Sequence, residues 1–360
     1  MSRMTRTLAA LLLAAMAAAS PAAAQFTPDA APEAPKPKDA KADTVNAPGP
    51  WKFTGVAALN MSQSAYSTNW NGGDEGNWVW VSRFDGAAER QTSRHFNTLN
   101  TLVIAYGQTS RQQTDPSDPG QRVWEAPSKT SDQISFESVG RFTYQSFADP
   151  YFAFRFETQF LDQSQPNGNL TLNPLRMKLS AGLAKMLLHD ADRDVITRFG
   201  VGVRTTMGRV YTELPPSTTT ASYTNNDAGL EWITTATLPM LSKRVLYKGR
   251  LGLFQPFMYS QANALEDYDV IAAAADPTHR AIADYWKTVD LNFENTFSAK
   301  ITANLGVELT AQLIYNKYDA TGNVDTSLDP AVLIPQVERN VRRAGQFRET
   351  FAMALSYRLF

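Results

Sequence analysis

Three histidines, His95, His189 and His279, are the side chains of this chain best suited to acid–base chemistry. A hydrolase of membrane lipids needs a serine and a histidine within hydrogen-bonding distance of each other. Two of the histidines fall in predicted turns at the opposite end of the fold from His279, and no histidine pair or HExxH zinc motif is present. We interpret them as surface histidines, so the sequence predicts no enzyme, no metal site and no cofactor.

A second set of chemically active residues consists of charges that alternate with apolar residues. Phe152, Phe154 and Phe156, for example, alternate with Arg155 and Glu157. Neighbouring side chains on a strand point to opposite faces, so such a strand has one apolar and one polar face. An Arg or Lys facing lipid near the membrane midplane costs about 2–4 kcal/mol. The charged alternates are therefore candidate lumen-lining residues of a barrel: Arg155, Glu157, Arg176, Lys178, Arg198, Arg204, Glu231, Lys248, Arg250, Asp290, Glu294, Glu308 and Arg348.

The signs of these charges are unevenly distributed along the chain. Basic residues concentrate between residues 151 and 258, and Asp290, Glu294 and Glu308 follow on the next two strands. Opposed charges can pair and occlude the interior, or they can flank a slit and act on polar solutes as charged rings do in pores. The narrow bore of a small barrel favours at least partial occlusion.

The elements that position these charges are about 12 strands, with 14 as the alternative count. Short and long connections alternate between them, as in outer-membrane barrels with short periplasmic turns and long extracellular loops. The sequence therefore predicts an all-β fold, an antiparallel transmembrane β-barrel. The expected strands are 51–62, 77–88, 96–108, 132–146, 151–162, 175–188, 195–208, 228–240, 245–258, 287–298, 301–316 and 347–360.

The N-terminal segments indicate export. Residues 1–24 combine Arg3 and Arg6, a short apolar run and small residues before Gln25, which is typical of a signal peptide. Residues 25–50 are rich in Pro, Ala and Lys and are expected to form a periplasmic linker, while 51–360 form the barrel. After the signal peptide the sequence has no run of 18 apolar residues, so no membrane-spanning helix is expected. The near-neutral formal charge of -1 does not favour nucleic-acid binding.

The C-terminal segment Phe347–Phe360 is predicted to be read by the barrel-assembly machinery. It ends in alternating apolar residues and an aromatic residue that lies one position out of register: Phe351, Met353, Leu355, Tyr357, Leu359 and Phe360. Two long loops, 270–286 and 328–344, contain helix-forming residues. Each is interpreted as an ordered outer loop, with a constriction folded into the lumen or a site for anionic surface lipid as the alternative.

The most distinctive motif follows the first strand and comprises Asn69, Trp70, Gly72, Gly73 and Glu75. Paired glycines allow backbone angles that are closed to other residues, and Asn favours tight turns. A folded turn at the barrel rim is therefore favoured over a ligand contact.

Together with the residues 62–64, this motif resembles the SQ…NW.GGE signature of a family of bacterial outer-membrane β-barrels catalogued as a domain of unknown function. Weaker similarities follow in the same order, including Thr158–Phe160, Asp290–Glu294 and Gln312–Tyr315. The resemblance extends over nearly all of 51–360. It implies an outer-membrane barrel and no known activity.

The sequence thus leads to an integral protein of the outer membrane, in contact with membrane lipid and lipopolysaccharide. The first hypothesis is a narrow channel or transporter for small polar solutes. The second is a structural or interaction barrel with an occluded lumen, whose loops bind lipopolysaccharide or a partner. An outer-membrane lipid hydrolase is the third and least favoured.

Overall fold

The strands form where apolar and polar residues alternate, because each strand then has one face for lipid and one for the interior. The computed structural model describes residues 47–67, 75–118, 121–144, 146–165, 167–190, 192–302 and 304–358. The signal segment, most of the linker, Phe360 and the motif residues Asn69, Trp70, Gly72 and Gly73 lie outside these residues. Glu75, the last residue of the motif, is exposed just before the second strand.

Within the described residues, one antiparallel sheet of 13 strands contains the short β4 (Arg122–Trp124) and twelve longer strands. Pairing of β2 with β3 and of β1 with β15 closes the twelve longer strands into a ring, which confirms the predicted barrel. The twelve are β1 (Lys52–Ser64), β2 (Asn77–Ser93), β3 (Phe96–Thr114), β5 (Ser128–Phe142), β6 (Asp149–Thr158), β9 (Leu175–His189), β10 (Asp194–Tyr211), β11 (Thr220–Met240), β12 (Val245–Tyr259), β13 (Asp290–Lys300), β14 (Leu305–Tyr315) and β15 (Gln346–Arg358).

Exposure alternates along the strands as a membrane barrel requires. On β6, Phe152 is 50% exposed, whereas its neighbours Tyr151 and Ala153 are buried. On β9, Leu179 is 62% exposed beside the buried Ser180. Large apolar side chains on the outside and polar ones inside are the reverse of a soluble protein, and they match a surface that faces lipid.

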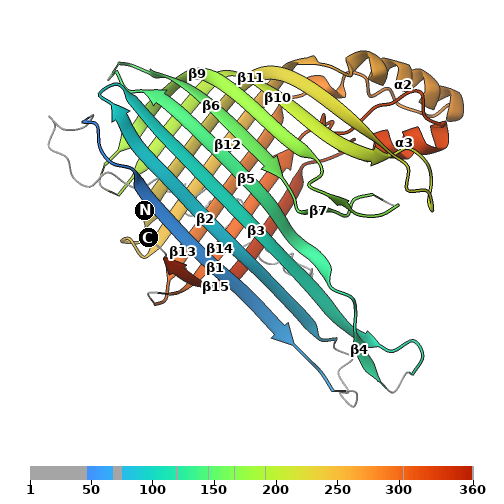
Figure 1. Ribbon diagram of the computed structural model, residues 1–360, viewed down its shortest axis with the longest axis horizontal. Helices are drawn as coiled ribbons and strands as arrows, with labels where there is room; N and C mark the ends of the chain where they lie inside the picture. The colour runs from blue at the N-terminus through green and yellow to red at the C-terminus, as the bar shows by residue number, and fades with distance from the viewer. Residues whose placement is uncertain are drawn as a thin grey trace, which may run out of the picture.

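The two ends of the barrel differ. Short turns, such as 94–95 and 241–244, join strands at one end, and the long connections gather at the other. Figure 1 shows α2 (Ala262–Ala275), α3 (Pro330–Glu338) and β4 at this second end, on the right of the view. The strand pair β7 (Leu161–Asp162) and β8 (Leu170–Thr171) and the 3-10 turn η1 (Tyr285–Lys287) also belong to the long connections.

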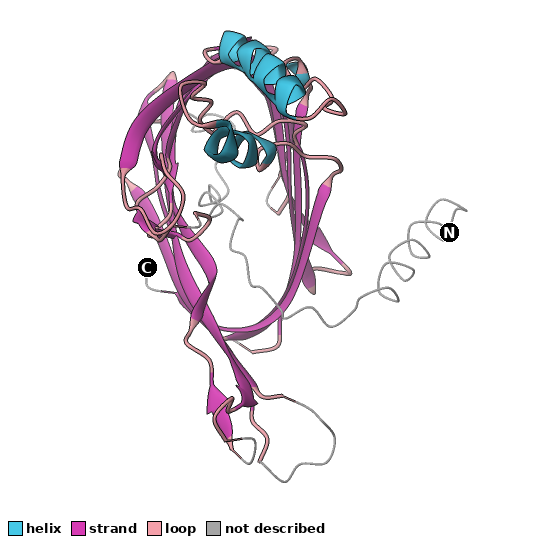
Figure 2. Ribbon diagram, turned by 90° about the vertical axis from the view of Figure 1, so that its right-hand side faces the viewer, coloured by secondary structure: helices cyan, strands magenta, loops and turns pink. Residues whose placement is uncertain are grey.

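The two helices cover part of the barrel mouth. Figure 2, a view along the barrel, shows an oval ring with both helices at the upper side of its opening. Leu265 and Tyr268 of α2 pack with Leu333 and Val337 of α3, and all four side chains are fully buried. The carboxylate of Asp329 accepts a hydrogen bond from the Ala331 amide (2.8 Å) and caps α3. None of the described helices is long and apolar enough to cross a membrane.

Several strand boundaries differ from those expected: β2 and β3 extend to Ser93 and Thr114, β5 spans Ser128–Phe142, and β6 spans Asp149–Thr158. Two further differences, at β11 and at the turn between β13 and β14, have a clear physical reason. β11 begins at Thr220 instead of residue 228, because its first eight residues are mostly polar and carry no alternation of large apolar residues that would mark a lipid-facing strand. The turn between β13 and β14 lies at 301–304 instead of 298–300. Backbone amides of Ile301 and Thr302 each donate to the Leu305 carbonyl (2.9 Å), so the exposed Ile301 belongs to the turn although its apolar side chain suggested a strand.

Candidate functional site: the charged lumen

A polar cavity of about 420 Å³ occupies the barrel interior toward the end with the long loops. Residues from ten of the twelve ring strands line it, all except β1 and β2. Nine of the thirteen charged residues predicted to face the lumen lie on its wall: Arg155, Glu157, Arg176, Lys178, Arg204, Glu231, Arg250, Asp290 and Glu294.

The other four predicted residues lie on the inward face outside this cavity. Arg198 is buried beside the cavity wall. Lys248 lies two residues before Arg250 on β12 and therefore faces the same side of the sheet. Glu308 shares a strand face with the buried Thr310 and Gln312, and Arg348 shares one with the buried Thr350.

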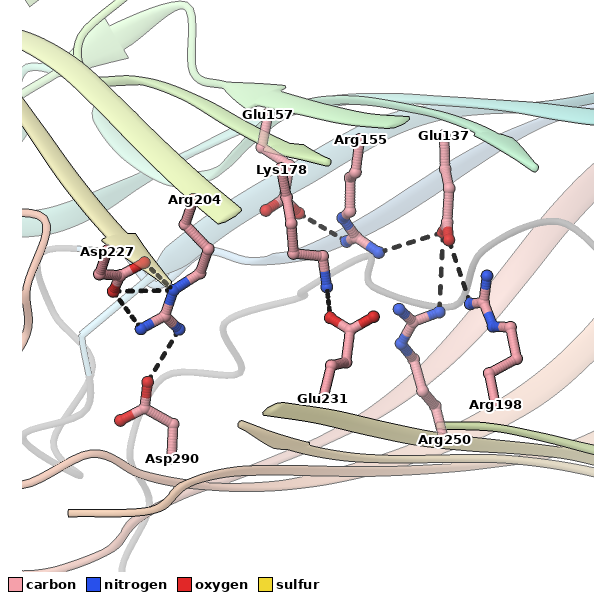
Figure 3. Close-up of polar contacts among 10 residues, drawn as sticks. All are labelled: Glu137, Arg155, Glu157, Lys178, Arg198, Arg204, Asp227, Glu231, Arg250 and Asp290. Atoms are coloured by element: carbon pink, nitrogen blue, oxygen red, sulfur yellow. Dashed lines mark hydrogen bonds and ion pairs between the residues drawn. The ribbon is translucent and has the colours of Figure 1, made fainter. Parts of the chain in front are cut away.

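The centre of the site is Glu137 of β5, a buried carboxylate that three arginines approach. Its oxygens lie 3.1 Å from Arg198, 3.4 Å from Arg155 and 3.8 Å from Arg250. These arginines belong to β10, β6 and β12, so the contact with β12 joins strands five places apart around the ring. Figure 3 shows Glu137 and Arg155 entering from one side and Arg198 and Arg250 from the other. The ion pairs therefore cross the lumen.

Two further groups of ion pairs lie nearby (Figure 3). Lys178 of β9 bonds to Glu231 of β11, whose side chain is almost fully buried. The Arg204 guanidinium bonds to both oxygens of Asp227 and, 2.8 Å away, to Asp290 of β13. Buried charges of this kind are stable only where partners satisfy them, and together these pairs tie consecutive strands from β5 to β13.

The expected separation of basic and acidic walls is wrong. Seven acidic and six basic side chains line the cavity, and acids lie among the bases. Glu137 and Asp227 are two of the acids that lie among the basic residues, and the sequence analysis predicted neither as a lumen-lining residue. Glu137 follows Phe136 in an alternating strand, so alternation was a signal for it, whereas Asp227 precedes the expected start of its strand by one residue.

On the side of Glu137 toward the short turns, one wall of the lumen is apolar. Tyr151, Ala153 and Ala184 form a buried cluster with Val139 and Ile196 against it. The Tyr151 ring lies 5.5 Å from the charged carbon of Arg198. The lumen thus changes from a polar cavity through an ion-pair crossing to an apolar wall.

At the end of the cavity near the long loops, Asp319 lies on the cavity wall and holds together the loop between β14 and β15. Its carboxylate accepts hydrogen bonds from the Thr321 amide (3.1 Å) and hydroxyl (2.7 Å) and lies 3.6 Å from Arg342. Burial raises the pKa of this carboxyl, but Arg176, the Thr321 hydrogen bonds and Arg342 outweigh burial and hold the pKa below its usual value of 3.8.

The histidines lie apart from one another. His95 occupies the turn between β2 and β3, and His189 ends β9, so both lie at the short-turn end. His279, at the other end, bonds to Asp269 through Nε2 (2.8 Å), and the same carboxylate accepts from the Ile282 amide. This arrangement anchors the loop after α2. Among the described residues, no cluster of histidine and carboxylate side chains is suited to a metal ion.

Comparisons with known proteins begin with two solved structures. The β-domain of the Bordetella autotransporter Brka shares 12% identity over 87% of this chain and 98% of its own, with a TM-score of 0.30. An outer membrane channel from Pseudomonas putida F1 shares 11% identity over 89% of this chain and 99% of its own, with a TM-score of 0.34. No curated protein sequence matches the chain. The model of a family described as protein of unknown function (DUF3078) matches residues 61–163, so this stretch of the chain is similar to that family.

Proposed function

We propose that this protein is an integral outer-membrane barrel that passes small polar solutes through a narrow, charged lumen. The observation that supports this most directly is the polar cavity of about 420 Å³, which leads from the long loops to the ion pairs of Glu137. A cavity of this size accommodates only small solutes. Side chains of both signs offer binding partners to solutes of either charge, with no strong selection between them.

The Glu137 crossing is the constriction of this route. Arg250 is the most distant of its three partners, and Arg155 and Arg198 still hold the carboxylate if Arg250 is lost. Removal of the Arg250 side chain is therefore the change most suited to widening the lumen while the barrel stays folded.

Single-channel recording tests the proposal. Purified protein in a planar bilayer should show small unit conductance, and Arg250→Ala should increase it. The control is Lys185→Ala, because Lys185 lies at the barrel end over the Phe147 ring (3.3 Å) and does not line the cavity. Silence of both the native protein and Arg250→Ala would refute the channel.

A barrel with an occluded lumen is the second candidate, and the ion pairs across the lumen favour it. In that case the cap of α2 and α3 is the functional surface, and lipopolysaccharide is the partner to test. Beside α3, the Arg339 guanidinium donates to the Ser164 carbonyl (3.2 Å), and the Arg342 guanidinium donates to the Arg339 carbonyl and lies 3.6 Å from Asp319. A channel that stays closed and loops that bind lipopolysaccharide in a pull-down would establish this alternative.

Membrane insertion is part of the same proposal. The last strand exposes Phe351, Met353, Leu355 and Tyr357 on one face, which suits recognition by the barrel-assembly machinery. Fractionation should find the protein in the outer membrane, with a folded band that shifts on heating. Recovery as a soluble periplasmic protein would contradict this location.

A further inference from the structure

The first and last strands of the barrel pair over only a short distance. Within the described residues, β1 and β15 pair at four positions, Val56–Leu59 with Leu355–Arg358. By contrast, β1 pairs with β2 along its whole length, and β15 pairs with β14 from Gln346 to Leu355. If this register continued, residues 60–64 of β1 would lie opposite 350–354 of β15, but these two segments form no strand pairing, and we call the boundary between them the seam.

The strands diverge at this seam. β1, β2 and β3 continue past the barrel toward β4, whereas β15 leads back to the side of α3 (Figure 1). In Figure 2 the same extension points away from the oval ring. The seam therefore widens toward the end of the barrel with the long loops.

An open sheet edge in lipid is unfavourable, because hydrocarbon offers no hydrogen-bond partner to the unpaired amides and carbonyls. The two edges can satisfy each other if the register of the paired part continues. Met61 then lies opposite Met353, and both side chains already face outward, 62% and 58% exposed. Closure of the seam thus needs no side chain to change face.

A buried polar side chain lies where the pairing stops. Asn60 is only 7% exposed, and among the described residues neither its amide nitrogen nor its amide oxygen has a hydrogen-bond partner. Asn60 lies beside the apolar Val81 of β2, which cannot satisfy it. A buried amide without partners is unfavourable and unusual in folded proteins. Its donor and acceptor remain available to a polar group that passes through the seam.

The seam joins two different environments. Inside, the polar cavity extends to Gln346, where the unpaired part of β15 begins. Outside, exposed apolar residues flank both edges, including Leu59 on β1 and Phe351 on β15. A molecule that fits both sides has a polar head group and an apolar chain.

We propose that the seam between β1 and β15 is a lateral gate. It opens and closes by breaking and forming the strand pairing of residues 60–64 with 350–354, and it passes a single-chain amphipathic lipid between the lumen and the membrane. The Asn60 amide hydrogen-bonds the head group during passage. This route is independent of conduction along the barrel axis.

Engineered disulfides test the gate, because the chain contains no cysteine. The variant Met61→Cys/Met353→Cys locks the seam closed when oxidised. The matched control, Leu59→Cys/Leu355→Cys, bridges the part that is already paired. The probe is a lysophosphatidylcholine with a photoreactive group near its head, in vesicles that contain the protein, and mass spectrometry locates the labelled residues.

Labelling of Asn60 and Val81 is expected in both reduced variants. Oxidation should abolish it in the Met61/Met353 variant, a reductant should restore it, and the control should be labelled equally in both states. Asn60→Leu should reduce the labelling of Val81. Failure of the Met61/Met353 disulfide to form, absence of label on both residues, or label that persists after oxidation would overturn the gate. Axial conductance of the same oxidised sample tests the channel separately, since the disulfide leaves the Glu137 crossing unchanged.

Discussion

Glu137→Gln should destabilise the barrel strongly, because the neutral side chain leaves three arginines without their shared carboxylate. At an effective dielectric constant of about 20, ion pairs at 3.1–3.8 Å each have a gross attraction of about 4–5 kcal/mol. Much of this offsets the cost of burying the charges. Removal of one partner from a buried pair typically costs about 3–5 kcal/mol, since the other charge stays buried. We expect a loss of this size in the free energy of unfolding.

Denaturant titration in lipid vesicles, followed by tryptophan fluorescence, measures this loss. Glu157→Gln is the matched control on the neighbouring strand, because the Glu157 side chain is 36% exposed and has Arg155 as its ion-pair partner at 2.5 Å. Such a partly exposed pair contributes up to about 1 kcal/mol. Equal losses for the two variants would refute the reasoning, since they would show that Glu137 does not hold the lumen together.

Three further perturbations follow from the same geometry. Phe154→Arg should reduce the heat-modifiable folded fraction, because it places a charge in lipid, whereas Arg155→Ala should still assemble; the opposite result would shift the register of β6 by one residue. The double change of Lys248 and Arg250 to Glu should lower the melting temperature and leave the reversal potential unchanged, since it places a negative charge beside Glu137. A shift in the reversal potential without a loss of stability would indicate an open slit. The pKa of Asp319 is held below 3.8, so its contribution to stability is present above that pH and is lost as the pH falls through the lower folded value. Hydrogen exchange of residues 316–345 should therefore rise only in strong acid, and Asp319→Asn should raise it already at neutral pH; an unchanged loop in both cases would contradict the link.

The sequence predicted the barrel well, because alternation on a membrane strand is enforced by lipid on one side. Phe152 and Leu179 face outward where alternation placed them, and long and short connections alternate as expected. The predicted strand ends were wrong where the strands extend beyond the membrane, because lipid imposes no alternation of apolar residues there. The first residues of β11 lie in a polar stretch, and Ile301 is an apolar residue in a turn.

The pairing of the lumen charges could not be predicted in the same way. Alternation tells which face a charge occupies, but not its height in a barrel with tilted strands. The contact between Glu137 and Arg250 joins residues more than 100 positions apart, and it depends on the ring order and register of all the strands between them. The short pairing of β1 with β15 likewise has no local signal, because both strands alternate normally.

The arrangement of ion pairs and seam divides the barrel into two parts. The ion pairs of Figure 3 join seven consecutive strands, from β5 to β13. The other five strands are β14, β15, β1, β2 and β3, and the seam lies among them, opposite the junction of β9 and β10. Bridges across the lumen resist separation of the strands that they join. Among the described residues, β1 and β15 pair at four positions and β14 and β15 at ten, so the seam separates at far lower cost than the junction of β14 and β15. The fold thus combines strands that ion pairs join across the lumen, from β5 to β13, with the proposed gate between β1 and β15. Opening this seam disturbs none of the contacts of Glu137.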